Sequence, residues 1–249
     1  MLKLQNVTVI YPGTAAGARQ GSDRRSADSP PAGIKAIDSL SFTLNEGENI
    51  ALIGENGAGK TSLLLAIVGI LELASGTVEM GGVQLTKKTV HEIRRQIGLV
   101  FQNPDDQLFM PLIYDDIAFG CRNFGLREDQ TRTRVEKTVT RLNISHLLDR
   151  SPLKLSSGEK RIAAIATVLA MNPSVLMFDE PTAFLDPKAK RTLVETLKKL
   201  NHAKIIATHD MEFANEVCNR VIVLKDGRIM ADGALSLLHD KELMRSYGL

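Results

Sequence analysis

The sequence has little of several features that mark specialised classes of protein. Only two of its 249 residues are cysteines, Cys121 and Cys218, and neither has a CxxC pattern or a histidine cluster beside it. A disulfide framework, a thiol-metal site and a redox site are therefore not indicated. We expect a reducing compartment, the cytoplasm, in which both thiols are buried as small apolar side chains.

Long apolar runs and an excess of charge of one sign are also missing. The longest apolar stretches, 63–71 and 162–171, reach about ten residues, against the ~20 that a membrane-spanning helix requires. Residues 1–10 lack the basic and then apolar order of a secretory signal. The formal net charge is only +2, without a basic stripe, so nucleic acid is not an expected partner.

Short runs rich in Ile, Val and Leu alternate with longer amphipathic stretches. They predict strands of a largely parallel sheet that is buried on both faces, and hence an α/β fold; the runs are 50–53, 97–101, 175–178, 205–207 and 221–224. Between the second and third runs helical patterns dominate, which predicts a helical subdomain at about 103–157 within a single domain spanning 1–249. Residues 14–33 are polar and lack an apolar period, so we expect a mobile surface loop there.

A glycine-rich segment, GENGAGKT at 54–61, satisfies G-x-x-x-x-G-K-[ST] between a predicted strand and a predicted helix at 62–71. Glycines allow backbone N–H groups to curl around phosphates, and the helix N-terminus adds positive charge. We expect Lys60 to contact the β and γ phosphates and Thr61 to offer its hydroxyl to Mg²⁺. The alternative is an ordinary strand-turn-helix connection that matches by chance.

Two carboxylates end another predicted strand, in VLMFDE at 175–180. At the carboxyl end of a strand beside a phosphate loop, one carboxylate can hold Mg²⁺ and the next can orient a water for in-line attack. We assign Asp179 to the metal and Glu180 to the water. The alternative is a pair of acids that only cap the exposed end of a strand.

Five motifs in a fixed order resemble those of ABC-type ATPases: GENGAGKT, Gln102 in VFQNPDDQLF, LSSGE at 155–159, MFDEPTAFLD at 177–186 and ATHD at 207–210. The resemblance implies a P-loop ABC-type nucleotide-binding domain with a helical subdomain and an N-terminal antiparallel β subdomain. It implies an ATPase with ATP and Mg²⁺ as cofactors. The ATP-binding residues that it implies are Tyr11, Gly54, Glu55, Asn56, Gly57, Ala58, Gly59, Lys60, Thr61 and Ser62.

The resemblance also assigns the remaining motif residues. His209 is similar to the switch histidine that contacts the γ-phosphate, and Gln102 to the glutamine that senses Mg²⁺ and water. Catalysis would then rest on Glu180, His209 and Gln102, and the Mg²⁺ ligands would be Thr61, Gln102 and Asp179. Tyr11 occupies the position of an adenine-stacking ring, although 14–33 separates it from the sheet.

In this family the signature segment of one subunit closes over the nucleotide of another, so the resemblance implies a homodimer. The residues acting in trans would be Ser156, Ser157, Gly158 and Glu159. Ser157 stands where Gly is usual and Glu159 where Gln is frequent, and Ser156 or Ser157 is also expected to cap the following helix. Asp186 resembles the aspartate that crosses the interface, and with Pro187 it also predicts a helix N-cap.

In this family the closing motion passes to membrane subunits, and the resemblance implies that they dock on the apolar segment near 108–119. The alternative for some of these residues is core packing of the helical subdomain. The same region is similar to energy-coupling-factor importers, and the segment from 205 to 249 is similar to their cobalt and nickel members. We therefore expect an ATPase subunit on the cytoplasmic face of the membrane that energises divalent metal import. The alternatives are a vitamin importer of the same type and a soluble, non-transport ABC protein. The last usually has a coiled coil or a second ATPase domain, and neither is seen here.

Overall fold

The structure, a computed structural model, describes residues 1–12 and 33–249. Its larger sheet has the strand order β10-β9-β3-β8-β7-β6 and is parallel except for the antiparallel edge pair β9 and β10. All five predicted runs form strands of this sheet, which confirms the parallel α/β prediction. The strands are β3 (Asn49–Ile53), β6 (Ile97–Val100), β7 (Val175–Asp179), β8 (Ala203–Thr208), β9 (Arg220–Lys225) and β10 (Arg228–Gly233).

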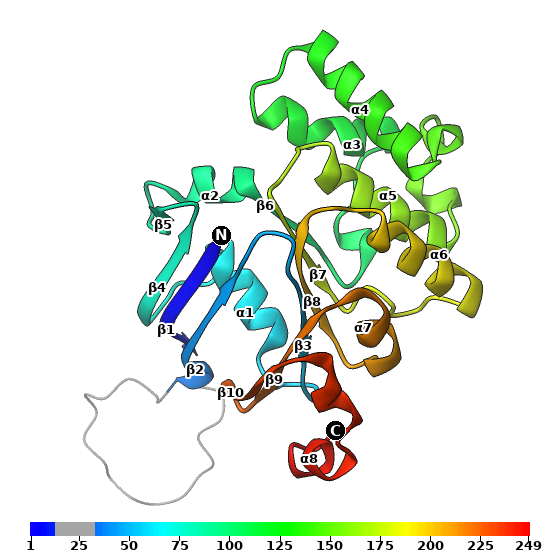
Figure 1. Ribbon diagram of the computed structural model, residues 1–249. Helices are drawn as coiled ribbons and strands as arrows, with labels where there is room; N and C mark the ends of the chain where they lie inside the picture. Colours follow the sequence, from blue (N-terminus) through cyan, green and yellow to red (C-terminus); the bar gives the residue numbers. More distant parts are fainter. Residues whose placement is uncertain (13–32) are drawn as a thin grey trace, which may run out of the picture.

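A second, antiparallel sheet has the order β2-β1-β4-β5. It comprises β1 (Leu2–Tyr11), β2 (Ile34–Leu44), β4 (Ser75–Met80) and β5 (Val83–Gln84). Helix α1 (Lys60–Ile67) lies between the two sheets (Figure 1), and one apolar cluster combines its Leu63 and Ile67 with side chains of both. The N-terminal β subdomain implied by the resemblance is thus present.

The helix after the phosphate loop is shorter than predicted. It ends at Ile67 instead of Leu71, because Gly69 adopts a left-handed φ of 65° and its N–H bonds to the Ala66 carbonyl. Glycine in this conformation stops a helix whatever the apolar pattern beyond it. Helix α2 (Val90–Gln96) follows β5 and leads into β6.

The opposite face of the parallel sheet is covered by α5 (Ser157–Leu169), α6 (Pro187–Lys198) and α7 (Met211–Val217). Along β3, Ile50 and Leu52 join the cluster around α1, whereas Ala51 and Ile53 join the cluster beneath these helices. Alternate residues of one strand therefore enter different cores. This explains why the strand sequences are apolar throughout instead of alternating.

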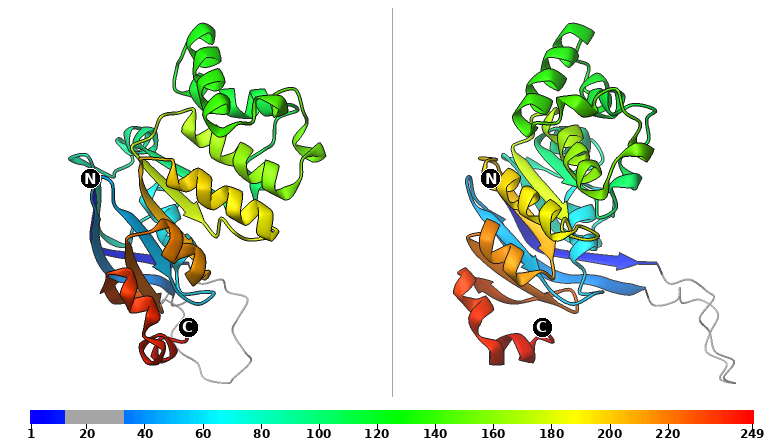
Figure 2. Two further views of the ribbon diagram at one scale, coloured as in Figure 1. Left: turned by 45° about the vertical axis from the view of Figure 1, so that its right-hand side comes forward. Right: turned by 90° about the vertical axis from the view of Figure 1, so that its right-hand side faces the viewer.

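Residues 103–157 contain helices and turns but no strand: η2 (Pro104–Asp106), α3 (Ile113–Asn123), α4 (Glu128–Leu142), η3 (Ser145–Leu147) and η4 (Pro152–Lys154). Figure 2 shows α3 and α4 standing beyond one edge of the parallel sheet. On α4, Val135 and Val139 are buried as their spacing predicts. The chain closes with η5 (Leu235–His239) and α8 (Lys241–Ser246).

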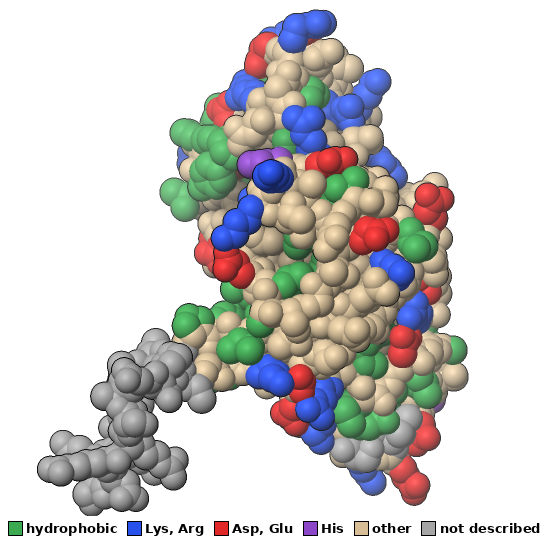
Figure 3. Space-filling view, turned by 90° about the vertical axis from the view of Figure 1, so that its left-hand side faces the viewer, with side chains coloured by type: hydrophobic (Ala, Val, Ile, Leu, Met, Phe, Trp, Pro, Cys, Tyr) green, Lys and Arg blue, Asp and Glu red, His purple; other side chains and the backbone are tan. Residues whose placement is uncertain are grey.

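Three further observations concern the molecule as a whole. The predicted mobile loop at 14–33 lies, except for Gly33, outside the described residues and stays a prediction. Within the ranges described, no helix combines the length and hydropathy that crossing a bilayer needs. On the face shown in Figure 3, acidic and basic side chains are interspersed.

Candidate functional site

The phosphate loop connects β3 to α1, as the sequence predicts. Gly57 and Gly59 have φ values of 86° and 103°, a region that L side chains rarely adopt. A Cβ on Gly59 would also lie 2.5 Å from the carbonyl oxygen of Ala36. Only glycine therefore allows the chain to turn at this point, directly before the first N–H groups of α1.

Thr61 and Asp179 meet across the gap between α1 and the end of β7. The Thr61 hydroxyl donates to Asp179 Oδ2 at 2.8 Å, while Asp179 Oδ1 is buried without a hydrogen-bond partner. Burial raises the pKa of Asp179, and the Thr61 hydrogen bond opposes that effect. An orphaned carboxylate oxygen beside a hydroxyl fits a hard cation such as Mg²⁺.

Two protein donors do not complete a magnesium site. Among the residues that the structure describes, no group of three or more His, Cys, Asp or Glu side chains is placed to hold a metal ion. Mg²⁺ characteristically combines one or two protein oxygens with phosphate oxygens and water. The donor set at Thr61 and Asp179 therefore suits a metal that arrives with a nucleotide.

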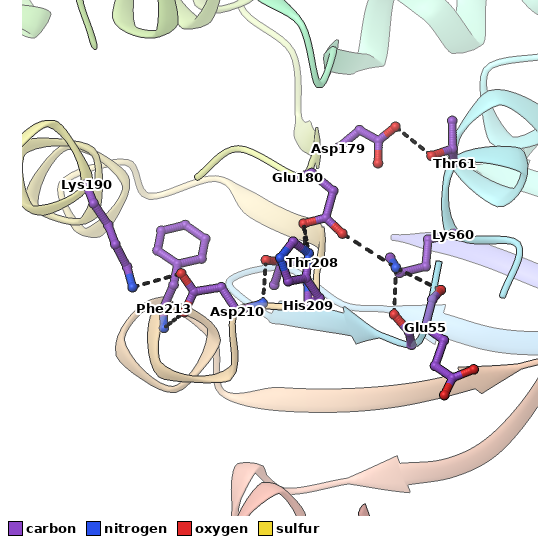
Figure 4. Close-up of polar contacts among 11 residues, drawn as sticks. Glu55, Lys60, Thr61, Asp179, Glu180, Lys190, Thr208, His209, Asp210 and Phe213 are labelled. Atoms are coloured by element: carbon purple, nitrogen blue, oxygen red, sulfur yellow. Dashed lines mark hydrogen bonds and ion pairs between the residues drawn. The ribbon is translucent and has the colours of Figure 1, made fainter. Parts of the chain in front are cut away.

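Glu180 lies between Lys60 and His209 (Figure 4). Its Oε1 is 3.5 Å from Lys60 Nζ, and its Oε2 is 2.9 Å from His209 Nδ1 and accepts the His209 backbone N–H at 3.3 Å. Lys60 also donates to the carbonyls of Gly54 and Glu55 at 2.6 and 3.2 Å. Predicted residues from three separate segments of sequence thus come together, with Glu180 buried and His209 two-thirds exposed.

A cavity of about 350 Å³ opens beside these residues. Its lining includes Tyr11, Gln102, Glu180 and the phosphate loop. The hydroxyls of Tyr11 and Ser62 are 3.1 Å apart, so Tyr11 reaches the loop even though the insertion follows it in sequence. The cavity therefore gathers most of the residues that we predicted for nucleotide binding.

The signature residues lie apart from this cavity within one chain. Ser156 caps α5 in a capping box: its N–H and hydroxyl each contact Glu159 Oε2 at 2.8 Å, which confirms the predicted cap and lowers the pKa of Glu159. A Cβ on Gly158 would lie 2.9 Å from Ala189 Cβ of α6. Ser157 is exposed at the first position of the helix.

Aspartates cap the two helices that follow β7 and β8. Asp186 accepts the N–H groups of Lys188 and Ala189 at 2.8 and 2.9 Å, which confirms the predicted N-cap and holds the pKa of Asp186 below its usual value. Asp210 accepts the N–H of Phe213 at 3.0 Å and pairs with Lys190 at 2.8 Å. This second cap ties α7 to α6 and fixes the backbone next to His209.

Our sequence analysis missed two groups that bear on the site. Asp210 follows His209 in ATHD, and an acid directly before a helical pattern could have identified it as a cap. Arg161 is 1% exposed in α5, where it directly precedes the apolar run 162–166. A cation within an apolar helical face is an available signal, because such groups are rarely buried without a reason.

Comparison with known proteins agrees with this geometry. The family model for ABC transporters matches residues 37–183. An ABC transporter ATP-binding protein of Geobacter sulfurreducens, named without a substrate, is 45% identical over 82% of each chain. A cobalt import ATP-binding protein, CbiO, of Rhodobacter capsulatus is 42% identical over 88% of this chain and 80% of its own. An energy-coupling factor transporter ATP-binding protein, EcfA, of Carboxydothermus hydrogenoformans is 40% identical over 88% and 82%.

Solved structures give the same result. CbiO1 of Clostridium perfringens, described as part of an ABC transporter complex, superposes with a TM-score of 0.77 at 36% identity, over 98% of this chain and 93% of its own. A dimeric bacterial ABC transporter cassette, MJ0796, superposes with a TM-score of 0.76 at 26% identity, over 94% and 99%. The chain therefore belongs to the ABC transporter family, as an ATP-binding and ATP-hydrolysing subunit of the energy-coupling-factor type.

Proposed function

We propose that two copies of this chain energise the import of a divalent metal ion, cobalt or nickel, through membrane partner subunits. The observation that carries the choice of metal is the likeness to CbiO proteins, 42% identical in sequence to one and 0.77 in TM-score to another. Metal selection belongs to the membrane partners in this proposal. The chain itself supplies the ATPase.

Binding of the nucleotide rests on the phosphate loop. Lys60 moves its ammonium group from the carbonyls of Gly54 and Glu55 to the β and γ phosphates, which carry more negative charge. Thr61 and Asp179 would hold the metal, and Gln102, which lines the same cavity as Thr61, would be a further ligand. When bound, Mg²⁺ supplies positive charge that offsets the charge developing on the transferred phosphoryl group. Tyr11 offers its ring to the adenine.

Activation of water falls to Glu180 and His209. Glu180 is 7% exposed and borders the cavity, so its carboxylate is placed to accept a proton from a water in line with the γ-phosphate. His209 Nδ1, 2.9 Å from Glu180 Oε2, fixes the orientation of that carboxylate. The imidazole is mostly exposed, which leaves its other nitrogen available to the γ-phosphate.

The remaining contacts to the nucleotide come from a second copy. Ser156, Ser157, Gly158 and Glu159 lie at the N-terminus of α5, where backbone N–H groups and the helix dipole favour an anion. They do not line the cavity beside the phosphate loop of their own chain. The dimeric cassette that this chain resembles supports an arrangement in which each copy completes the site of the other.

Membrane subunits are proposed to dock on the segment near 108–119. Phe109 is 61% exposed and meets Phe119 edge to face, with ring centroids 5.1 Å apart. Asp116 holds the segment in place by accepting the N–H groups of Phe109 and Met110 at 3.0 Å each. Exposed aromatic side chains on a fixed backbone suit an apolar partner helix. In this proposal the chain lies peripherally on the cytoplasmic face of the membrane.

The test is transport by the chain reconstituted in vesicles together with its membrane partner subunits. We expect ATP-dependent uptake of radioactive Co²⁺ or Ni²⁺, lost with Glu180→Gln. The 40% identity to an energy-coupling-factor ATPase named without a metal supports a second candidate, a vitamin importer with two different ATPases. Uptake of a vitamin in place of either metal would overturn the first proposal. So would a purified Glu180→Gln chain that stays monomeric with ATP and dimerises only with a second, different ATPase.

A further inference from the structure

The backbone after β6 is fastened to the signature helix α5 by a buried arginine. Arg161 Nη1 donates to the carbonyl of Phe101 at 2.8 Å, and Nη2 donates to the carbonyl of Gln102 at 2.7 Å. Arg161 is 1% exposed and its Nε is buried without a hydrogen-bond partner. None of the ion pairs among the described residues includes it. Its guanidinium is therefore held by these two carbonyls alone.

A second side chain fastens the same residues to the same helix. Gln107 Oε1 accepts the N–H of Phe101 at 3.1 Å, and its Nε2 donates to the Ala164 carbonyl at 2.9 Å and to Thr167 Oγ1 at 2.8 Å. Both backbone polar groups of Phe101 are thus bound by side chains of α5 or by a side chain bonded to α5. The position of Gln102, one residue later, follows from that of the helix.

This arrangement is unfavourable for stability alone. Burial lowers the pKa of Arg161 to about 10, opposed by the field of Asp179, so the side chain stays charged at neutral pH. Two neutral carbonyls compensate a buried cation incompletely, and well-packed apolar residues often stabilise a fold at least as well. What the cation does uniquely is bind two successive carbonyls with one planar fork.

We propose that Arg161 is a positioning residue: it couples the position of Gln102 to the position of the signature helix α5. The inference rests on the proposed function, in which the N-terminus of α5 closes on the nucleotide of the partner copy while Gln102 serves the nucleotide of its own chain. When α5 moves toward the partner, Arg161 carries the carbonyls of Phe101 and Gln102 with it. One helix then links the two ATP sites.

The first test is amide hydrogen exchange of the full chain without metal or nucleotide. Arg161→Met should speed exchange in the peptide covering 98–107 while the thermal midpoint stays unchanged or rises. Arg161→Lys should give an intermediate rate, because one ammonium replaces half of the fork. The matched control is Lys160→Met, which removes the exposed Lys160–Asp105 pair (2.6 Å) between the same helix and the same segment and should change nothing. Unchanged exchange in Arg161→Met, or equal effects of both methionine variants, would overturn the proposal.

The second test is ATP turnover against Mg²⁺ concentration. Arg161→Met should raise the half-activating Mg²⁺ concentration ~10- to 100-fold, with ATP binding in EDTA unchanged. Because Arg161 acts through Gln102, the double variant Arg161→Met/Gln102→Ala should have the same turnover as Gln102→Ala alone. Independent, multiplying effects would refute the role of Arg161. Wild-type chain without Mg²⁺-dependent turnover would instead count against the proposed function, and the exchange experiment would still decide this inference.

Discussion

Glu180 combines two features that are unusual for a glutamate. Its φ of 42° lies in the left-handed region, and its side chain is nearly inaccessible to solvent. The backbone N–H bonds to the Ala207 carbonyl at 2.8 Å, which links the residue to β8 next to His209. Strain of this kind persists where the surroundings over-determine the conformation, and such positions cluster at catalytic sites.

Replacing Glu180 by Gln tests its role as the residue that accepts the water proton. The amide keeps the size of the side chain but has almost no basicity, so turnover should fall by ~10² to 10⁴. ATP binding should persist, because Lys60 and Thr61 are intact. Steady-state turnover and nucleotide binding measure the two effects, and near-normal turnover would contradict the assignment.

Phe184 is strained without an evident contact that requires it. Its φ is 64° and its side chain is 81% exposed. A left-handed conformation costs an L residue roughly 1–2 kcal/mol. Glycine avoids this strain, but it loses more conformational entropy on folding, which offsets part of the gain. Phe184→Gly should therefore stabilise the fold by up to ~1 kcal/mol and raise the melting temperature by ~2–4 °C. A lower melting temperature would show that the ring contributes contacts within the chain.

The thiol of Cys218 should be inert in the folded protein. Burial raises its pKa to about 12, so at pH 8 on the order of one thiol in 10⁴ is ionised. Native chain should react slowly with Ellman's reagent up to pH 9, and protein unfolded in guanidinium should release two equivalents at once. Rapid labelling of Cys218 in the native chain would contradict this. Cys121, which is also buried, is the internal comparison, and peptide mapping identifies which thiol has reacted.

At the scale of elements, packing of α5 against the parallel sheet places the signature and the Gln102 segment. The contact depends on Gly98 of β6, where any Cβ would collide with Val168 of α5. The helix also supplies Arg161 and, through Ala164 and Thr167, the partners of Gln107. One close approach between a strand and a helix therefore positions both the signature residues and the Gln102 segment, which the proposed function assigns to two different ATP sites.

Gly98→Ala should weaken that contact. Overpacking a filled core costs about 1–3 kcal/mol, so the urea midpoint should fall by the corresponding amount. Gly233→Ala is the matched control, because its Cβ would meet only the flexible end of Leu237. Equal stability of the two variants would show that α5 and β6 can separate without cost.

At the scale of the whole molecule, the proposed dimer requires each chain to carry two halves of different sites. The phosphate loop and the signature lie on separate parts of the surface, and the resemblance to a dimeric cassette supports their pairing across two copies. A chain acting alone would leave the N-terminus of α5 without an anion. Activity is therefore expected to depend on association.

Mixing two inactive variants tests this pairing. Lys60→Met should remove the proposed phosphate contact, and Ser157→Asp should repel the γ-phosphate bound by the partner copy. An acid at the first position of a helix is favourable, so the second variant should fold. In a random mixture half of the dimers contain one copy of each variant, and one of the two sites in such a dimer keeps both wild-type residues. The mixture should therefore recover about a quarter of wild-type turnover. Absence of any recovery would contradict a shared site, and each variant alone is the control.

The sequence alone determined the local chemistry. Glycine spacing predicted the phosphate loop, and apolar runs predicted five strands of the parallel sheet. Asp186 with Pro187 predicted the start of a helix. These features could be predicted because each depends on residues that are close together in the sequence. The order of the five motifs identified the family from the sequence alone. The pattern failed at α1, where apolar residues continue past Ile67 but the left-handed Gly69 ends the helix.

Only the tertiary structure decided which distant groups meet. Lys60, Glu180 and His209 converge because β3, β7 and β8 are parallel neighbours whose carboxyl ends share one edge. The hydrogen bond from Arg161 to the carbonyl of Gln102 follows only from the packing of α5 against β6, because the two residues are 59 positions apart in the sequence. Strand order and burial are set by the packing of the entire chain, and a local pattern contains no information about them.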